Sequence, residues 1–211
     1  MPRIIAGEYR SRRLVAPDDD ALTRPYTDRV KESVFNLLRG WFDGARVLDL
    51  FAGVGTMGLE TVSRGAAKVL LVEQNRKVFK LLEDNIHALG CGDRAEAMLG
   101  DALGSACLLR APKPVDIVFI DPPYEMMKRQ DSRRRILGHV SRCTEVMGDH
   151  AFIVLRSPID PEGAESFEFS LPGLDGPEVH KHGSEMWVLL YQPTLEKEAR
   201  RSSGIAEEST G

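Results

Sequence analysis

A carboxylate, two prolines and an aromatic ring stand together in DPPY, directly after the apolar run VDIVFI. Prolines stiffen the backbone and remove amide donors, so the carbonyl groups here remain as acceptors. Asp121 and the Pro122 carbonyl can accept hydrogen bonds from a planar exocyclic amine, and Tyr124 can stack on the ring that carries it. Such acceptors favour the positively charged nitrogen that forms as an amine takes up a methyl group. The set predicts amine methylation without a metal or a covalent intermediate. Its members are Asp121, Pro122, Pro123 and Tyr124.

A glycine-rich loop in the stretch VLDLFAGVGTMGLE forms a second group. Gly53, Gly55 and Gly58 match G-x-G-x-x-G, and an acidic residue, Glu73, follows about 20 positions after the first of them, as in the dinucleotide fingerprint. Asp49, just before the loop, would repel a pyrophosphate and favour a cofactor with a cationic ammonium. S-adenosylmethionine has an α-amino group, a sulfonium and an adenosine, and its ammonium can face Asp49 directly or through water. The glycines allow the backbone to approach this cofactor closely.

Three acidic residues lie at or after the ends of successive apolar runs, where open α/β sheets bind their ligands. Besides Asp49, Glu73 can accept hydrogen bonds from both ribose hydroxyls, and Asp101 can accept one from the adenine amino group. Each acid alone also fits a helix cap or a surface charge, and DPPY alone also fits a rigid turn; their common position favours a cofactor site. We assign to it Asp49, Phe51, Ala52, Gly53, Gly55, Glu73, Asp101 and Ala102.

Two basic segments contrast with the formal net charge of −4 of the whole chain. Residues 1–13 hold four arginines and one glutamate, and residues 128–142 hold six basic residues and one aspartate. Each segment alone fits a solvated surface, but together they predict contacts with nucleic-acid phosphates and a strong dependence of binding on salt. The candidate RNA-binding residues are Arg3, Arg10, Arg12, Arg13, Arg29, Arg133, Arg134 and Arg135.

Composition limits the class of protein. The three cysteines show no paired metal-ligand spacing and are typical of reduced thiols in a cytoplasmic protein. The chain holds no apolar run of about 18 residues that would span a membrane. Its start, MPRIIAGEYRSRR, turns charged before it reaches the length of a signal peptide. We therefore expect a cytoplasmic protein without a membrane segment or a metal site. Since the sequence has no obvious coiled coil or surplus apolar helix, we also expect a monomer.

The spacing of apolar residues predicts the elements that position these groups. A helix should begin at Thr27, with an apolar face that includes Val30, Val34, Leu37, Leu38 and Trp41. Strands then alternate with helices, which indicates an α/β fold with a doubly wound, mainly parallel sheet. A closing antiparallel pair should consist of ESFEFSL and EMWVLLYQ. The predicted strands before this pair are RVLDLF, KVLLVE, AEAMLG, VDIVFID and AFIVLR. We divide the chain into a basic N-terminal extension (1–39), a cofactor-binding domain (40–193) and a disordered tail (194–211).

These motifs resemble the class I S-adenosylmethionine-dependent methyltransferases that methylate amines. More narrowly, the chain resembles the bacterial family that methylates guanine N2 in 16S ribosomal RNA, of the guanine-966 type. The glycine loop and DPPY are shared by many methyltransferases, whereas two N-terminal stretches, RIIAGEYRSRRL and TRPYTDRVKESVFNLL, are specific to this RNA family. The matching stretches are RIIAGEYRSRRL, TRPYTDRVKESVFNLL, VLDLFAGVGTMGLETVSRGA and DIVFIDPPY, with a looser match in HGSEMWVLLY.

The resemblance implies a seven-stranded Rossmann-like sheet with an antiparallel last strand, and a basic extension that helps to bind RNA. It places Thr23, Arg24 and Pro25 near the methionine end of the cofactor. It also implies 16S ribosomal RNA as the partner, either naked or within an assembling small subunit, with the target base splayed out or flipped. Two residues depart from the family pattern: Tyr26 replaces a small hydroxyl residue, and Lys31 replaces an arginine.

Other functions stay open at this point. The same chemistry can serve adenine N6 in DNA or another RNA, and the basic extension is what favours 16S RNA. The side-chain amide of a protein glutamine is another possible substrate, although the enzymes that methylate it have a motif closer to NPPY than to DPPY. The literal G-x-G-x-x-G suggests a nicotinamide-dependent oxidoreductase, against which Asp49 argues. A non-catalytic RNA-binding or ribosome-assembly factor would have no use for a cofactor pocket and DPPY.

Overall fold

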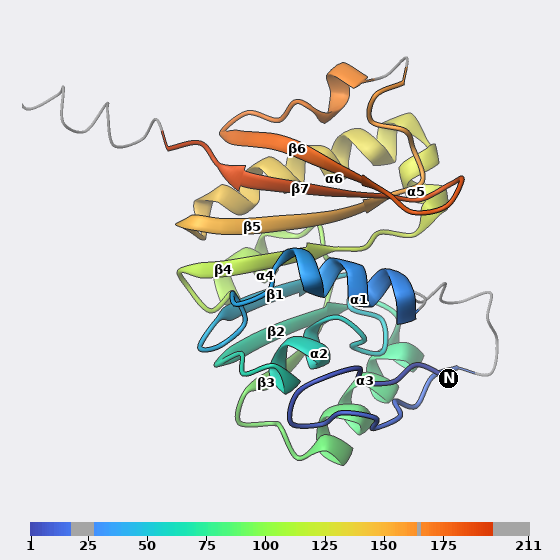
Figure 1. Ribbon diagram of the computed structural model, residues 1–211, viewed down its shortest axis with the longest axis vertical. Coiled ribbons are helices and arrows are strands. Elements are labelled where there is room, and N and C mark those ends of the chain that lie inside the picture. The colour runs from blue at the N-terminus through green and yellow to red at the C-terminus, as the bar shows by residue number, and fades with distance from the viewer. Residues whose placement is uncertain (18–27, 164–165, 196–211) are drawn as a thin grey trace, which may run out of the picture.

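A computed structural model describes residues 1–17, 28–163 and 166–195 of the chain. Its centre is a seven-stranded sheet with the strand order β3-β2-β1-β4-β5-β7-β6 (Figure 1). β7 is antiparallel to both of its neighbours, and the pairs among β1 to β5 are parallel. The strands are β1 (Arg46–Leu50), β2 (Lys68–Glu73), β3 (Ala95–Leu99), β4 (Val115–Ile120), β5 (Met147–Ser157), β6 (Leu174–Lys181) and β7 (Trp187–Pro193). The predicted seven-stranded, mainly parallel α/β sheet with an antiparallel last strand is confirmed.

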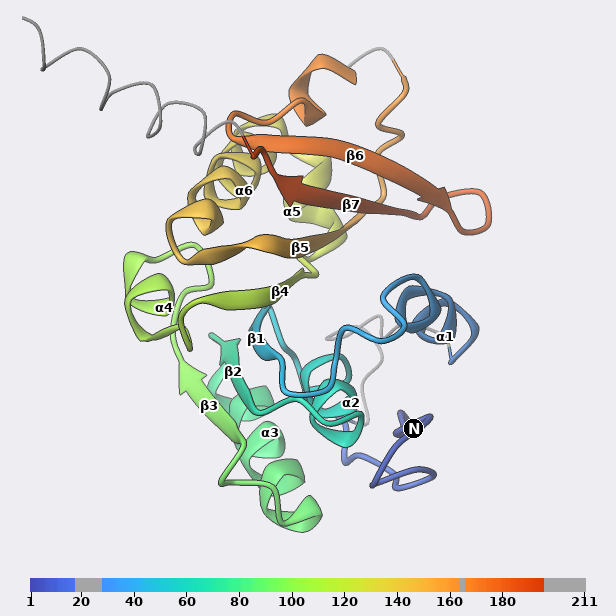
Figure 2. The same ribbon diagram turned by 60° about the vertical axis from the view of Figure 1, so that its left-hand side comes forward.

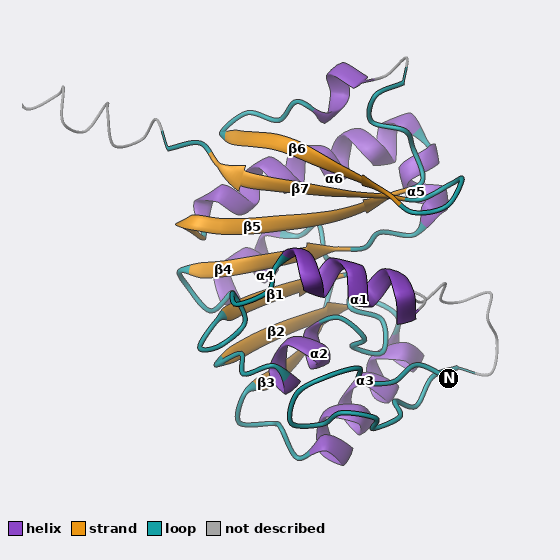
Figure 3. Ribbon diagram, viewed as in Figure 1, coloured by secondary structure: helices purple, strands orange, loops and turns teal. Residues whose placement is uncertain are grey.

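Helices cover both faces of the sheet, which explains why its central strands are apolar on both sides. Side chains alternate along a strand, so Val47 of β1 joins one buried cluster with α1, α2 and α3, whereas its neighbour Leu48 joins another with α4, α5 and α6. Figures 2 and 3 show helices on both sides of the strands. The helices are α1 (Asp28–Leu37), α2 (Gly58–Ser63), α3 (Arg76–Leu89), α4 (Ser105–Arg110), α5 (Tyr124–Lys128) and α6 (Gln130–Arg142), with 3-10 turns η1 (Cys143–Glu145) and η2 (Ser166–Phe169). No helix in these described ranges is long and apolar enough to cross a membrane.

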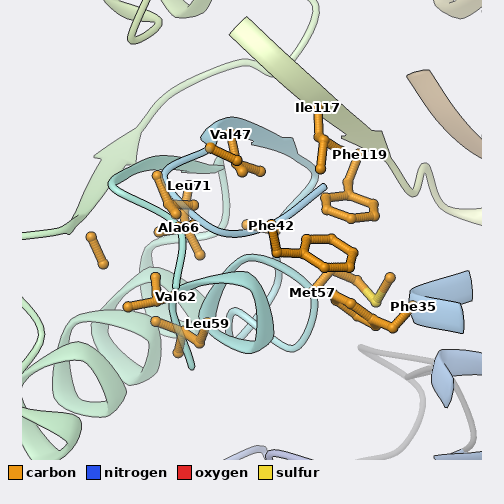
Figure 4. Close-up of a cluster of buried hydrophobic side chains, with 14 of the residues drawn as sticks. Phe35, Phe42, Val47, Met57, Leu59, Val62, Ala66, Leu71, Ile117 and Phe119 are labelled. Atoms are coloured by element: carbon orange, nitrogen blue, oxygen red, sulfur yellow. The ribbon is translucent and has the colours of Figure 1, made fainter. Parts of the chain in front are cut away.

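The first helix packs on the sheet through Phe35, which the sequence pattern had not placed on its apolar face. The Phe35 ring lies 4.9 Å from the Phe42 ring and 5.9 Å from the Phe119 ring of β4, between centroids (Figure 4). The expectation for the end of this face was wrong, because Leu37 is 38% exposed and Trp41 is 45% exposed. α1 ends at Leu37, so the helical period no longer applies at Trp41.

A buried carboxylate attaches the N-terminal arm, residues 1–17, to α1 and α2. Glu60 of α2 is fully buried and accepts hydrogen bonds from the Ile5 amide at 2.7 Å and the Ala6 amide at 3.0 Å. Lys31 Nζ, on α1, and Arg64 Nε lie 2.8 and 2.9 Å from the same carboxylate. One acidic side chain thus fixes the position of the basic arm relative to two helices.

The predicted closing pair of strands is half wrong. β7 lies where EMWVLLYQ predicted a strand, but Ser166–Phe169 of ESFEFSL form η2, and β6 lies in the following Gly/Pro-rich segment. Pro177 is tolerated there for two reasons: β6 is the outermost strand, and its register with β7 shifts between Asp175 and Glu178. Proline lacks an amide donor and occurs in sheets at such outer strands and bulges.

Part of the predicted site falls on residues outside the described ranges. These residues are Thr23, Arg24 and Pro25, together with Tyr26 and the tail after Leu195. Their assignment to the cofactor lid and to a disordered tail stays a prediction.

Candidate active site

The parallel strands bring acidic residues together where the strands end, at a line that we call the carboxyl edge. In the sheet register, Leu50 of β1 pairs with Ile120 of β4, which pairs with Leu155 of β5. The residues that follow, Asp121 and Arg156, therefore lie side by side at this edge. It is the edge at which ligands of open α/β sheets bind.

Asp49 is buried at the end of β1 and is held by the glycine loop. Its Oδ2 accepts a hydrogen bond from the Gly58 amide at 2.8 Å, and Asp49 is 1% exposed. Burial raises the pKa of Asp49 to about 8, against the effect of this hydrogen bond; the Asp121 and Glu73 carboxylates raise it further. Because the charges that act on Asp49 from these two residues are negative, a cationic ammonium fits this position.

The third glycine of the loop permits the close approach of α2 to Asp49. A Cβ atom at Gly58 would lie 2.7 Å from Leu71 Cδ2 and 2.9 Å from Asp49 Oδ2. At Gly55, whose φ is +89°, a Cβ atom would lie 2.7 Å from Leu82 Cδ1. These glycines therefore serve the packing of the loop between β1, α2 and α3.

Glu73, at the end of β2, organises the opposite side of the loop. Its Oε2 accepts a hydrogen bond from the Gly53 amide at 3.0 Å, and its Oε1 accepts one from the Asn75 amide at 2.6 Å. Phe51 adopts a φ of 62°, a strained conformation for a non-glycine residue and common at ligand sites. Ala52 is buried, and its amide donates to the Val72 carbonyl at 2.9 Å. Each carboxylate oxygen of Glu73 can accept a further hydrogen bond from a ribose hydroxyl.

Asp101 follows β3 at the same edge and is exposed. Its Oδ1 accepts a hydrogen bond from the Leu103 amide at 2.9 Å, which fixes the carboxylate beside the buried Ala102. The three acids assigned from the sequence thus lie at or just after the ends of three adjacent strands, in the spatial order β3, β2, β1. This set of acceptors fits a cofactor with an amine at one end and an adenosine at the other, as S-adenosylmethionine has.

The DPPY segment connects β4 to α5. Pro123 precedes the helix, and its carbonyl accepts hydrogen bonds from the Met126 amide at 2.9 Å and the Met127 amide at 3.3 Å. Since the Pro123 carbonyl caps α5, the Pro122 carbonyl is the one that we assign to an amine. Asp121 is 18% exposed at its side chain, and its Oδ1 forms an ion pair with Nε of Arg156. Burial raises the pKa of Asp121 to about 6, although Arg156 opposes the rise.

Comparison with known proteins places this arrangement in a family. Residues 2–168 match the family described as conserved hypothetical protein 95. The ribosomal RNA small subunit methyltransferase D of Escherichia coli (strain K12) is 37% identical over 161 residues, which cover 75% of each chain. The chain belongs to this methyltransferase family. The relative of the same name in Haemophilus influenzae is 38% identical over 125 residues, covering 58% of this chain and 63% of its own. A solved structure of the Escherichia coli protein YhhF, described as a methyltransferase, is 32% identical, with a TM-score of 0.72 over 90% of this chain and 97% of that chain.

Membership in the ribosomal RNA small subunit methyltransferase D family confirms the resemblance drawn from the four sequence stretches. It also favours the methyltransferase interpretation of the glycine loop over the nicotinamide one. The solved structure extends the match across the sheet, including the strands that follow DPPY. The residue-by-residue roles at the carboxyl edge remain assignments from geometry.

One of the eight arginines predicted to bind RNA is a structural residue in this methyltransferase. Arg133 is 2% exposed, its Nε lies 2.7 Å from Glu168 Oε2, and it donates to the Met127 carbonyl at 3.0 Å. It is therefore withdrawn from the RNA-binding set, because its guanidinium is occupied inside the protein. The exposed arginines of the set are Arg3, Arg10, Arg12, Arg13, Arg29, Arg134 and Arg135.

The basic arm, residues 1–17, places its turn away from the carboxyl edge. Its turn packs beside the ends of α2 and α3 that lie away from the carboxyl edge: the Glu8 amide donates to the Ser63 carbonyl at 2.7 Å, and Arg12 donates to the Ala88 carbonyl at 2.8 Å. Figure 1 shows the arm running from the N-terminus along these two helices. Arg10 and Arg12 thus lie at the far end of the arm, not beside Asp121.

Two residues of the site escaped the sequence analysis. Arg156 pairs with the Asp121 carboxylate, and a cation at the end of the apolar run AFIVLR was the available signal. Asn85 of α3 is 1% exposed and donates to the Val54 carbonyl of the glycine loop at 3.0 Å. Its side chain also exchanges hydrogen bonds with the Val15 backbone, at 2.7 and 2.9 Å. A polar residue on the apolar face of a helix was the signal for Asn85.

Proposed function

We propose that this methyltransferase transfers a methyl group from S-adenosylmethionine to the exocyclic N2 of a guanine in 16S ribosomal RNA, at a site of the guanine-966 type. The observation that carries the proposal is the position of Asp121, an acceptor beside Asp49 at the carboxyl edge and directly before the two prolines of DPPY. The names of the relatives support the ribosomal RNA of the small subunit as substrate.

The cofactor would be held by the acids that end the first strands. Asp49 receives the ammonium, Glu73 the ribose hydroxyls and Asp101 the adenine amine, while the backbone of the glycine loop borders the cofactor. When bound, S-adenosylmethionine supplies an electrophilic methyl group on a sulfonium. Thr23, Arg24 and Pro25 would cover the methionine end.

Asp121, Pro122 and Tyr124 act on the base. Tyr124 stacks on guanine, and Asp121 Oδ2 and the Pro122 carbonyl accept hydrogen bonds from the amine. These acceptors stabilise positive charge as the N–C bond forms and the C–S bond breaks. One N–H proton then passes to Asp121 Oδ2 and on to solvent, because a methylated aryl ammonium is strongly acidic. The amine is inaccessible inside a helix, so the base enters splayed out or flipped.

Several wider features belong to the same proposal. The exposed arginines would contact phosphates, and the substrate is either naked RNA or an assembling small subunit. We keep as proposals the division into residues 1–39, 40–193 and 194–211, a monomeric state and a cytoplasmic location.

The test is transfer of labelled methyl groups from S-adenosylmethionine to unmodified small subunits, naked 16S RNA and DNA. We expect label in RNA that digests to N2-methylguanosine, and at least a hundredfold loss with Asp121→Ala while cofactor affinity stays within twofold. Asp116→Ala is a matched control, since Asp116 lies at the other end of β4 and binds the Arg46 amide at 2.7 Å. Label in adenine or DNA would support the alternative adenine-N6 activity. Loss of cofactor binding in Asp121→Ala would show that the assignment of Asp121 to the amine is wrong.

A further inference from the structure

Arg156 is a buried cation that the proposed mechanism does not yet use. It lies near the end of β5, is 6% exposed, and contacts Oδ1 of Asp121 through Nε. Its guanidinium carbon also lies 5.3 Å from the centre of the Tyr124 ring. One side chain thus touches both the carboxylate and the aromatic ring that we assign to the target base.

The two contacts restrict how these groups can move. A guanidinium is planar and donates in fixed directions, so its contact through Oδ1 sets the rotation of the Asp121 carboxylate. Its position over the Tyr124 ring adds a cation–π attraction of about 0.5–2 kcal/mol, which favours one ring position. With Oδ1 turned to Arg156, Oδ2 is the oxygen presented to an amine.

We infer that Arg156 is a positioning residue for methyl transfer, which holds the Asp121 carboxylate and the Tyr124 ring as one unit against the amine. This inference rests on the proposed function, because it assumes that Asp121 receives the amine. A neutral carboxyl in place of the carboxylate would accept less well and would not attract the developing positive charge.

The charge of Arg156 also keeps Asp121 ionised near neutral pH. Burial raises the pKa of Asp121 to about 6, and Arg156 is what lowers it against burial. The charged groups that face Asp121 are Arg156 from β5 and Asp49 from β1, and Glu73 acts on Asp49 in turn. Removing Arg156 therefore raises the pKa of Asp121 above about 6, into the range where most activity assays are run.

The first test is the pH dependence of kcat at saturating S-adenosylmethionine, which keeps Asp49 paired with the ammonium. For Arg156→Met we expect the acidic limb of the kcat–pH profile to move to higher pH by roughly one to three units, because a neighbouring arginine usually lowers the pKa of an aspartate by that amount. For Arg156→Lys we expect the limb near its original pH but a kcat lowered at least threefold, because lysine keeps the charge and loses the planar contacts. A limb that does not move in Arg156→Met overturns the inference.

Arg133→Met is the matched control, since Arg133 is buried like Arg156 but is paired with Glu168 and not with Asp121. We expect it to lower thermal stability and leave the pH of the limb unchanged. A limb that shifts equally in Arg133→Met would assign the effect to general loss of structure and overturn the inference.

A second measurement does not depend on RNA. The carboxyl carbon of Asp121 can be titrated by NMR in the protein without substrate, and its midpoint should rise in Arg156→Met and stay near the original value in Arg156→Lys. If the unmodified protein methylates no RNA, the proposed function fails, and the titration still tests the pairing of Arg156 with Asp121. If RNA is methylated but neither the limb nor the midpoint moves, the inference on Arg156 fails alone.

Discussion

Glu60 offers the sharpest test of how the basic arm is attached. The substitution is Glu60→Ala, which removes the carboxylate that Lys31 Nζ and Arg64 Nε approach within 2.8 and 2.9 Å. The Lys31 side chain is 2% exposed and that of Arg64 is 19% exposed, so the lysine has little access to water. Burial lowers the pKa of Lys31, while Glu60 raises it. Without Glu60 the buried Lys31 ammonium therefore loses its paired carboxylate and keeps the Arg3 carbonyl, at 2.9 Å, as an acceptor.

The magnitude follows from these contacts. Removing one partner of a buried ion pair destabilises a protein by about 3–5 kcal/mol. The Ile5 and Ala6 amides also lose their acceptor, but both residues are only partly buried and water can replace it. We expect the free energy of unfolding to fall by about 3–5 kcal/mol, with a lower urea midpoint and an unchanged slope.

Urea denaturation followed by circular dichroism measures this change. The control is Glu145→Ala, because Glu145 pairs with Arg142 at 3.3 Å on the surface, with side chains 58% and 45% exposed. For this control we expect a loss below about 1 kcal/mol. If Glu60→Ala costs no more than the control, the arm is not anchored through Glu60 and the reasoning is refuted.

Three further predictions concern cofactor and RNA binding. The pKa of Asp49, about 8, should fall when an ammonium binds, so calorimetry should show proton release on binding of S-adenosylmethionine. The affinity for S-adenosylmethionine should then rise up to tenfold per pH unit from pH 6 to 8, and Asp49→Asn should abolish this rise. A pH-independent affinity of the unsubstituted protein would remove Asp49 from the site. Gly58→Ala should lower cofactor affinity at least tenfold, because the added methyl group collides with Asp49; equilibrium dialysis that finds normal affinity contradicts this. Replacing Arg10, Arg12 and Arg13 by alanine should weaken RNA binding and reduce the slope of log K against log salt by about 2, with kcat at saturating RNA unchanged; an unaltered slope in filter binding excludes the arm from the interface.

The arrangement of the three acids at the carboxyl edge was predictable from sequence because it depends on local patterns. Asp49, Glu73 and Asp101 each end or follow an apolar run, and parallel strands separated by helices end at one edge. β6 was not predictable in this way. The alternation in ESFEFSL is a short signal, and the proline in LDGPEVHK argues against a strand until its outermost place in the sheet is known.

The errors among the arginines have a common physical cause. A sequence shows where charge is, but neither its burial nor its partner. Arg133 stands among exposed cations in the chain, yet its partner Glu168 lies 35 residues further on. Arg156 looked like the end of an apolar strand, and only the neighbouring register of β4 and β5 reveals its pairing with Asp121.

The distance between the turn of the basic arm and Asp121 bears on the kind of substrate. Arg12 binds the Ala88 carbonyl near the end of α3, whereas the glycine loop and Asp121 lie at the carboxyl edge, where that helix begins. α3 has 14 residues and so spans about 21 Å. A ligand that touches both Arg12 and the site must therefore extend well beyond one nucleoside. Over such a length the arm can select phosphates but not a single base. This favours a structured RNA over a small amine as the substrate of this methyltransferase.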